Sequence, residues 1–237
     1  MSSEQELNTI LKEYISDFIS KQNLPYVVKP AIPIVWFGDM EKYKNSPQKI
    51  VTIGINPSLE EFSEKRFNIV NLGNENSVYE LINTLNSYFT YNPYTKWFNS
   101  FERVLSQLSA SYFENKAKNT AIHIDVYSAI ATNPTWRQLS DTEQNGIKRI
   151  DLFKKLLNLL NPDIILFSVN QKVFDNVFYQ FRPDRCIENI SGKKGFFIRK
   201  YKNGNKILIS GRNMNGSPFG GLSNSEIQEA MERLSDK

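Results

Sequence analysis

Apolar residues recur along the chain with two different periods, one typical of helices and one typical of buried strands. Between residues 7 and 18 they follow an i, i+3, i+4 spacing, which predicts an amphipathic helix. Short runs rich in β-branched residues at 49–55 (KIVTIGI), 120–127 (TAIHIDVY) and 163–169 (DIILFSV) predict buried strands. The chain therefore combines helices with a sheet.

Capping and turn signals mark further elements. Ser140 with Glu143 forms the S-x-x-E pattern of a capping box ahead of an apolar stripe, and Ser223 with Glu226 repeats it before a last helix that we expect to reach about residue 234. Asn203-Gly204 predicts a hairpin. The two segments that flank this turn lie at 196–201 and 206–210. Further helices are expected at 78–89, at 97–108 and at about 171–181.

The alternation of strands and helices predicts an α/β fold with three layers, αβα, around a central, mostly parallel sheet of four strands. We expect a single domain over residues 1–237 with an N-terminal helical extension over about 1–30. In open α/β sheets the active crevice lies beyond the carboxyl ends of the strands. Polar groups fall at three such ends: residues 56–58, Asp125 onward and Ser210 onward.

The composition excludes several kinds of chemistry. A single cysteine, Cys186, allows no internal disulfide, no thiolate zinc site and no iron–sulfur cluster. A single histidine, His123, argues against a Ser-His-Asp or Cys-His system. No apolar run approaches the ~18 residues of a membrane span, and the first ten residues lack the apolar region of a signal peptide. We expect a cytoplasmic monomer without metal or cofactor.

The net charge of +4 is distributed unevenly. Residues 189–225 hold seven Lys and Arg and no Asp or Glu, which leaves 22 of the 29 cations and all 25 anions in the rest of the chain. A mildly acidic body with one cationic segment indicates a surface that faces a polyanion. A solvated hairpin with lysine-rich edges would show the same pattern.

Two short motifs carry the candidate chemistry. The first, GINPS at 54–58, has neither the GxGxxG pattern of a dinucleotide loop nor the GK[ST] of a Walker loop, and alone it is typical of a turn. The second, NGSPF at 215–219, follows the strand at 206–210. Together they resemble the two signature motifs of the uracil-DNA glycosylase superfamily, especially its mismatch-specific branch, which has GINPG and a second motif beginning with Asn. The order, separation and strand-end contexts agree; the first helix and residues 92–98 lie outside the resemblance.

The resemblance implies a role for each residue of the first motif. A base glycosylase passes through an oxocarbenium-like transition state, so its site must hold a water, stabilise the departing base and exclude solvent. In the family the polar residue of the first motif holds that water, which by position is Asn56 here. An amide can orient water but cannot take its proton near neutral pH. Ile55 and Pro57 then belong to the base-binding loop, and Asn215 lies where relatives contact the base carbonyl.

Two departures from the family pattern indicate which base the protein would excise. Relatives strict for uracil carry a tyrosine at the position of Ser58, so Ser58 leaves room for a 5-substituent; capping of the following turn is the alternative. The family usually has an asparagine where Asp125 stands. An ionised carboxylate only accepts hydrogen bonds, which favours the N4 amino group of cytosine over O4 of uracil; a turn or N-cap role is the alternative. His123 shares the strand face of Asp125 and can tune it, or can be a satisfied core histidine.

Aromatic residues complete the implied pocket. In the family a ring about a dozen residues after the water-holding residue stacks on the flipped base, which indicates Phe67, with Phe62 as the alternative and a core role as a third possibility. The segments 92–98 and 132–136 are candidate pocket walls, or turns with aromatic anchors.

The second motif is expected to contact DNA. Ser217 suits a phosphate, and Phe219 occupies the place of the apolar wedge that fills the gap left by a flipped nucleotide. Arg212 and Lys200 would attract phosphates from the cationic segment.

These features predict a monofunctional DNA glycosylase that flips a pyrimidine out of double- or single-stranded DNA and hydrolyses its glycosidic bond. The expected base is a 5-modified cytosine, such as the glucosylated hydroxymethylcytosine of phage DNA, which would make the protein an antiviral defence enzyme. Repair of uracil or mismatched pyrimidines is the first alternative. A non-catalytic nucleic-acid-binding module of the same fold, or an unrelated α/β enzyme that holds a phosphorylated ligand at residues 54–58, are the others.

Overall fold

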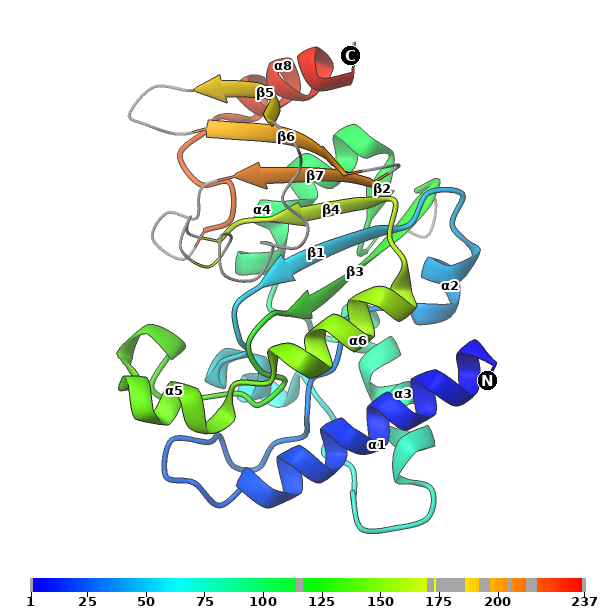
Figure 1. Ribbon diagram of the computed structural model, residues 1–237, viewed down its shortest axis with the longest axis vertical. Coiled ribbons are helices and arrows are strands. Elements are labelled where there is room, and N and C mark those ends of the chain that lie inside the picture. Colours follow the sequence, from blue (N-terminus) through cyan, green and yellow to red (C-terminus); the bar gives the residue numbers. More distant parts are fainter. Residues whose placement is uncertain are drawn as a thin grey trace. The chain divides into compact units, whose positions relative to one another are not determined.

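The computed structural model describes residues 2–113, 117–169, 173, 186–191, 197–203, 206–211 and 217–235. It is an α/β fold with a parallel sheet of five strands and helices around it, as the alternation of elements predicts (Figure 1). The chain forms two compact units, and each is assembled from three separate segments. Unit 1 comprises Met1–Met40, Gly54–Tyr94 and His123–Asn161, and unit 2 comprises Glu41–Ile53, Thr95–Ile122 and Pro162–Lys237.

Unit 2 contains the sheet, apart from the last residues of β1 and β3, which belong to unit 1. The sheet has seven strands in the order β2-β3-β1-β4-β7-β6-β5, so the prediction of four strands is wrong. Five neighbouring strands are parallel, and β6 and β5 extend the sheet antiparallel beyond β7. The strands are β1 (Ile50–Gly54), β2 (Ala110–Ser111), β3 (Asn119–Asp125), β4 (Ile164–Phe167), β5 (Cys186–Ser191), β6 (Phe197–Asn203) and β7 (Lys206–Gly211).

The three predicted buried strands are present in the sheet as β1, β3 and β4. Ile50 pairs with Ile164 across β1 and β4, and Ile164 pairs with Ile207 across β4 and β7. Every residue of β1 and β4 is buried, which explains why both are continuous apolar runs with little polar alternation. The one polar side chain of β1, Thr52, bonds through its hydroxyl to the hydroxyl of Tyr112.

The predicted hairpin is confirmed by the pairing of Asn203 with Lys206 across β6 and β7. The strand β5 has no strong sequence signal, because it is an edge strand that depends on its pairing with β6. The helix expected at about 171–181 lies outside the described residues, apart from residue 173.

The helices described in unit 2 include one that was not expected, α2 (Met40–Asn45), and two that were, α4 (Thr95–Leu105) and α8 (Asn224–Ser235). The helix α2 starts at the boundary with unit 1, and α4 continues into a short 3-10 turn, η3 (Ser106–Leu108). The last helix, α8, follows the predicted capping box, in which Glu226 N–H donates to the Ser223 hydroxyl at 3.2 Å. The guanidinium of Arg103 on α4 donates to Asn224 Oδ1 at 2.7 Å and ties α4 to the start of α8.

Phe219 is a core residue of unit 2. It is 1 % exposed, its ring lies edge-on to Phe101 with the ring centres 5.7 Å apart, and its N–H donates to the hydroxyl of Ser168 at 3.2 Å. A β-carbon on Gly211, at the end of β7, would overlap this ring. The absence of a side chain at Gly211 therefore creates the space that Phe219 fills, whereas the wedge predicted from the sequence requires an exposed ring.

Unit 1 is built on helices α1 (Ser3–Lys21), α3 (Ser77–Asn86), α5 (Asp141–Ile147) and α6 (Ile150–Leu160). The six apolar positions predicted for the first helix are all buried, and α1 packs against α6 and α3 (Figure 1). A capping box between Ser2 and Gln5 starts α1 ahead of its apolar stripe. The N-terminal segment, expected as an extension, thus contributes to the core of unit 1.

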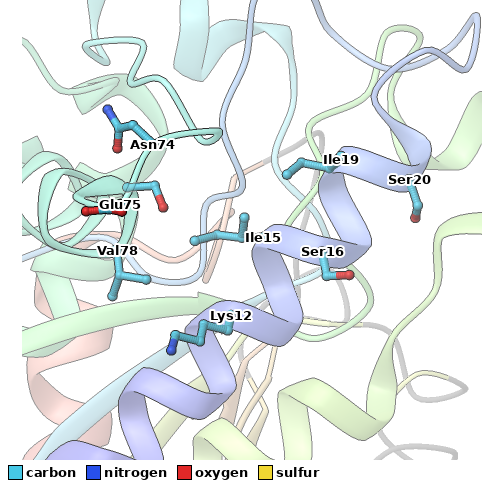
Figure 2. A pocket seen from close by; sticks show the side chains of 9 residues that line it. Lys12, Ile15, Ser16, Ile19, Ser20, Asn74, Glu75 and Val78 are labelled. Carbon is cyan, nitrogen blue, oxygen red and sulfur yellow. The ribbon is translucent and has the colours of Figure 1, made fainter.

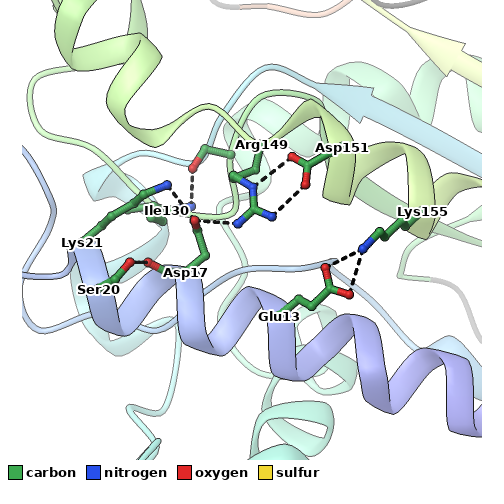
Figure 3. Close-up of polar contacts among 9 residues, drawn as sticks. Glu13, Asp17, Ser20, Lys21, Ile130, Arg149, Asp151 and Lys155 are labelled. Carbon is green, nitrogen blue, oxygen red and sulfur yellow. Dashed lines mark hydrogen bonds and ion pairs between the residues drawn. The ribbon is translucent and has the colours of Figure 1, made fainter.

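Ion pairs link α1 to the start of α6 (Figure 3). Asp17 on α1 accepts from Lys21 at 2.6 Å and from the Arg149 guanidinium at 2.7 Å, and Arg149 also bonds to Asp151 at 2.7 Å. The N–H of Arg149 donates to the carbonyl of Tyr127 at 2.6 Å. Lys148 is extended and Arg149 is non-helical, so the apolar stripe after Ser140 is divided between α5 and α6.

No helix within the described part of the chain combines the length and apolar character needed to cross a membrane.

We predict that Gly211→Ala lowers the free energy of unfolding by about 1–3 kcal/mol, because the new methyl group overlaps the buried Phe219 ring. Chemical denaturation of both proteins measures the difference. In a Phe219→Ala background the same glycine substitution should cost less than about 0.5 kcal/mol, since the two positions are coupled only through that ring. Equal costs in the two backgrounds would contradict the packing described.

Candidate functional site

The GINPS segment forms a corner at the carboxyl end of β1, and the chain that follows β3 runs beside it. Val126 N–H donates to the Gly54 carbonyl at 3.2 Å, Tyr127 N–H to the Ile55 carbonyl at 3.0 Å and Thr132 N–H to the Pro57 carbonyl at 3.2 Å. We call residues 54–58 the corner. Its neighbour is the polar strand end that contains Asp125, so two of the three predicted strand ends meet within unit 1.

The side-chain amide of Asn56 is oriented by main-chain carbonyls. Its Nδ2 donates to the carbonyl oxygens of Pro57 and Ile130, both at 2.8 Å. Since each carbonyl requires an N–H donor, these contacts assign the nitrogen and direct Oδ1 to the other side. Oδ1 accepts from the Thr132 hydroxyl at 3.4 Å and has a second lone pair that can accept from a water. The half-buried Asn56 is thus an oriented acceptor.

Asp125 lies against the corner together with His123. The carboxylate Oδ1 is 3.7 Å from His123 Nε2, and the two side chains are 5 % and 1 % exposed. A β-carbon at position 54 would stand 2.5 Å from Asp125 Oδ1 and 2.8 Å from His123 Nε2. The glycine that opens the motif is therefore needed for this close approach, which the sequence showed only as a turn residue.

Glu61 is the residue of this region that the sequence interpretation missed. It follows Ser58 in an S-x-x-E pattern at the start of the 3-10 helix η1 (Leu59–Lys65), a signal that could have indicated it. Its Oε2 accepts from both the N–H and the hydroxyl of Ser58, each at 2.7 Å. Ser58 therefore has the capping role that was its alternative.

Burial raises the pKa of the Glu61 carboxyl from its ordinary 4.5 to about 7, because desolvation outweighs the two hydrogen bonds from Ser58, and the charge of Asp125 adds to the rise. Glu61 is 8 % exposed. The region thus holds two nearly buried carboxyl groups, Asp125 and Glu61, which are close enough to interact by charge.

The predicted stacking residue Phe67 lies in an aromatic cluster. It is 5 % exposed, and its ring stacks on Tyr88 with the ring centres 4.6 Å apart. Phe37 and Phe62 lie 5.9 Å and 5.6 Å from it. Of the two candidates, Phe62 is the more exposed, so its ring is the better placed to contact a ligand.

Part of the 92–98 segment lies next to η1. Asn92 Nδ2 donates to the Glu64 carbonyl at 3.1 Å, and Tyr94 N–H donates to the Tyr88 hydroxyl at 3.0 Å. The Arg66 guanidinium carbon lies 5.1 Å from the centre of the Tyr94 ring. The 132–136 segment likewise touches the corner through Thr132. Both candidate walls therefore contribute residues to the region around residues 56–66.

The residues of the second motif belong to unit 2. Ser217 is half-buried, and its hydroxyl lies 2.9 Å from that of Ser100. Lys200 is on β6, paired with Ile209 of β7. Asn215 and Arg212 lie outside the described residues.

A hollow elsewhere in unit 1 is lined by few side chains that could take part in catalysis. It has a volume of about 530 Å³ and lies between α1 and the start of α3, where Lys12, Ile15 and Ile19 face Asn74, Glu75 and Val78 (Figure 2). Its lining contains one cation and one anion and is otherwise apolar or small and polar. The polar groups around the corner are the stronger candidate for a functional site.

Comparison with known proteins gives no relationship: no family model matches the chain, and no curated protein matches its sequence.

We predict that Asn56→Asp destabilises unit 1, although the two side chains have the same size. A carboxylate would face the Pro57 and Ile130 carbonyls without donors, which we expect to cost about 2–4 kcal/mol at pH 7. The deficit should shrink as the pH falls toward 4, because this environment raises the pKa of the new carboxyl and protonation restores one donor. Urea denaturation at several pH values measures it.

Asn68→Asp, at an exposed position of the same unit, is the control and should be neutral within about 0.5 kcal/mol. A fully stable Asn56→Asp protein at pH 7 would show that the two carbonyl contacts do not hold the amide.

Proposed function

We propose that this protein is a monofunctional DNA glycosylase of the uracil-DNA glycosylase type, with a three-layer αβα fold and a 5-modified cytosine as its base. The observation that carries the proposal is the oriented amide of Asn56. With both N–H groups bound to carbonyls, its Oδ1 can accept a hydrogen bond from a water beside a strand end that carries a second polar group, Asp125.

The reaction needs only positioned polar groups. The bond between C1′ of the deoxyribose and the base nitrogen breaks, the base leaves with the electron pair, and the sugar takes on oxocarbenium character. A water held by Asn56 adds to C1′ and loses its proton, and a proton reaches the departing base. Because the amide cannot accept the water's proton, orientation is its contribution, and the sugar cation supplies the reactivity.

Asp125 supports the choice of base. A carboxylate accepts from the N4 amino group of a cytosine but repels O4 of a uracil. The side chain at Ser58 is small, and it is bound to Glu61, so it does not extend as a tyrosine would. Both features favour a cytosine that carries a substituent at carbon 5, which would suit defence against phage with modified DNA.

The DNA strand would be attracted by the cationic segment at 189–225, which includes Lys200 and Arg212. Ser217 suits a phosphate contact. We do not assign Phe219 the role of a wedge between DNA bases, because its ring is buried.

The first test is Asn56→Ala. Its rate of base release from an oligonucleotide with 5-glucosylated hydroxymethylcytosine should fall by about 100-fold or more, since the water loses its orientation. Alkali cleavage of abasic sites measures the rate, and DNA affinity should change less than about threefold. Asn68→Ala is the matched control. Binding of DNA by the wild type without any scission would instead favour a non-catalytic module.

The second test is Asp125→Asn. An amide can pair with O4 and N3–H of uracil, so the ratio of uracil release to modified-cytosine release should rise by about tenfold or more. Competition between the two oligonucleotides measures this ratio. Asp141→Asn, at an exposed position on α5, should leave it unchanged. An unaltered ratio in Asp125→Asn would refute the assignment of base recognition to this carboxylate.

A further inference from the structure

The corner is held from two sides. On one side Thr132 pairs with Ser58 in a parallel bridge and bonds to the Pro57 carbonyl and to Asn56 Oδ1. On the other side Glu61 accepts both polar hydrogens of Ser58 through one oxygen. Glu61 therefore holds the corner at Ser58, and Thr132 holds it at Pro57 and Asn56, with the backbone of residues 56–58 joining the two sets of hydrogen bonds.

Elsewhere in unit 1 the chain repeats the same local contact with less burial. At the start of α5, Glu143 Oε2 accepts from the N–H and the hydroxyl of Ser140, each at 2.8 Å. Glu143 is half-buried, unlike the buried Glu61, and these bonds lower its pKa. Glu61 makes the same two bonds, yet its pKa is raised to about 7, because it is buried and faces Asp125. Capping a helix does not require a buried carboxyl. The burial of Glu61 and its raised pKa are therefore features of the candidate site and not of helix capping.

The groups around Glu61 come from three neighbouring segments. Ser58 donates to it from the corner, and the carboxylate of Asp125 at the end of β3 disfavours its charge. Burial raises the pKa of the Tyr88 and Tyr94 hydroxyls, and the negative charge of Glu61 adds to both rises, with Glu60 contributing at Tyr94. The cation in this region, Arg66, is bound to the Glu60 carbonyl and to Glu64. A proton on Glu61 is therefore opposed by the hydrogen bonds from Ser58 and favoured by burial and by Asp125.

Ionisation of Glu61 changes how firmly it holds the corner. A carboxylate accepts hydrogen bonds roughly twice as strongly as a neutral group. When Glu61 takes up a proton, its bonds to Ser58 weaken, and the restraint on the neighbouring Pro57 and Asn56 weakens with them.

We propose that Glu61 is a positioning residue of this site, whose ionised carboxylate fixes the corner and the Asn56 amide, so that base release depends on its ionisation. This inference rests on the proposed function for its link to base release. The restraint on Asn56 can be tested without it.

The kinetic test compares the wild type with Glu61→Gln and Glu143→Gln between pH 5.5 and 8.5. The single-turnover rate of the wild type should rise about three- to tenfold across a midpoint near 7 and then level off, since the ionised carboxylate holds the corner more firmly than the neutral carboxyl. The glutamine of Glu61→Gln still accepts from Ser58 but does not titrate. Its rate should be flat in pH and three- to tenfold below the wild-type plateau, with unchanged DNA affinity.

Glu143→Gln is the matched control, because it alters the same capping contact at a less buried position. It should keep the wild-type profile. A rising limb that persists in Glu61→Gln, or that disappears in Glu143→Gln, would overturn the proposal.

An NMR titration tests the restraint independently of catalysis. In the wild type and in Glu143→Gln, the Ser58 N–H and the Asn56 side-chain amide signals should move with pH around a midpoint near 7, and in Glu61→Gln they should not. If no DNA is cleaved but both signals titrate, the proposed function fails while the restraint on Asn56 stands. If the Asn56 signal does not titrate in the wild type, Glu61 does not position it, whatever the activity.

Discussion

Two carbonyl oxygens, those of Pro57 and Ile130, decide what the candidate site can be. Each lies 2.8 Å from the nitrogen of Asn56, and an unpaired carbonyl in a half-buried position is costly. They therefore require an amide at position 56, although a carboxylate there would be a better base for the proton of a water. The contact with Ile130 also joins the end of β1 to the chain that follows β3. The same hydrogen bond therefore orients the Asn56 side chain and connects the two strand ends.

The polar groups around this amide are close because the backbone leaves them room. Gly54 allows His123 and Asp125 to approach the end of β1, and the turn at Ser58 brings Glu61 back toward it. Burying carboxyl groups is unfavourable unless they are bonded; Ser58 donates two hydrogen bonds to Glu61, and His123 Nε2 lies 3.7 Å from Asp125 Oδ1. Such a grouping is more typical of a functional site than of a core built only for stability.

The ion pairs of unit 1 are connected to the segment that follows Asp125. Arg149 binds Asp17 and Asp151 through its side chain, and its N–H binds the carbonyl of Tyr127, two residues after Asp125. The helix α1 is thereby connected to the strand end that carries the candidate base-recognising carboxylate. The N-terminal helix belongs to the architecture of the site, although nothing in its own sequence indicates that.

The sequence by itself determined the elements whose signals are local: the amphipathic stripe of α1, the buried runs of β1, β3 and β4, the capping boxes at Ser140 and Ser223, and a polar corner at a strand end. Only the tertiary structure decided which of these local patterns are buried. Ser58–Glu61 and Ser140–Glu143 are the same pattern in sequence, but distant segments cover only the first. Phe219, in the turn after β7, likewise became a core residue because Gly211 at the end of that strand leaves space for it. Desolvation and packing depend on contacts between residues far apart in the chain, and short sequence patterns do not contain them.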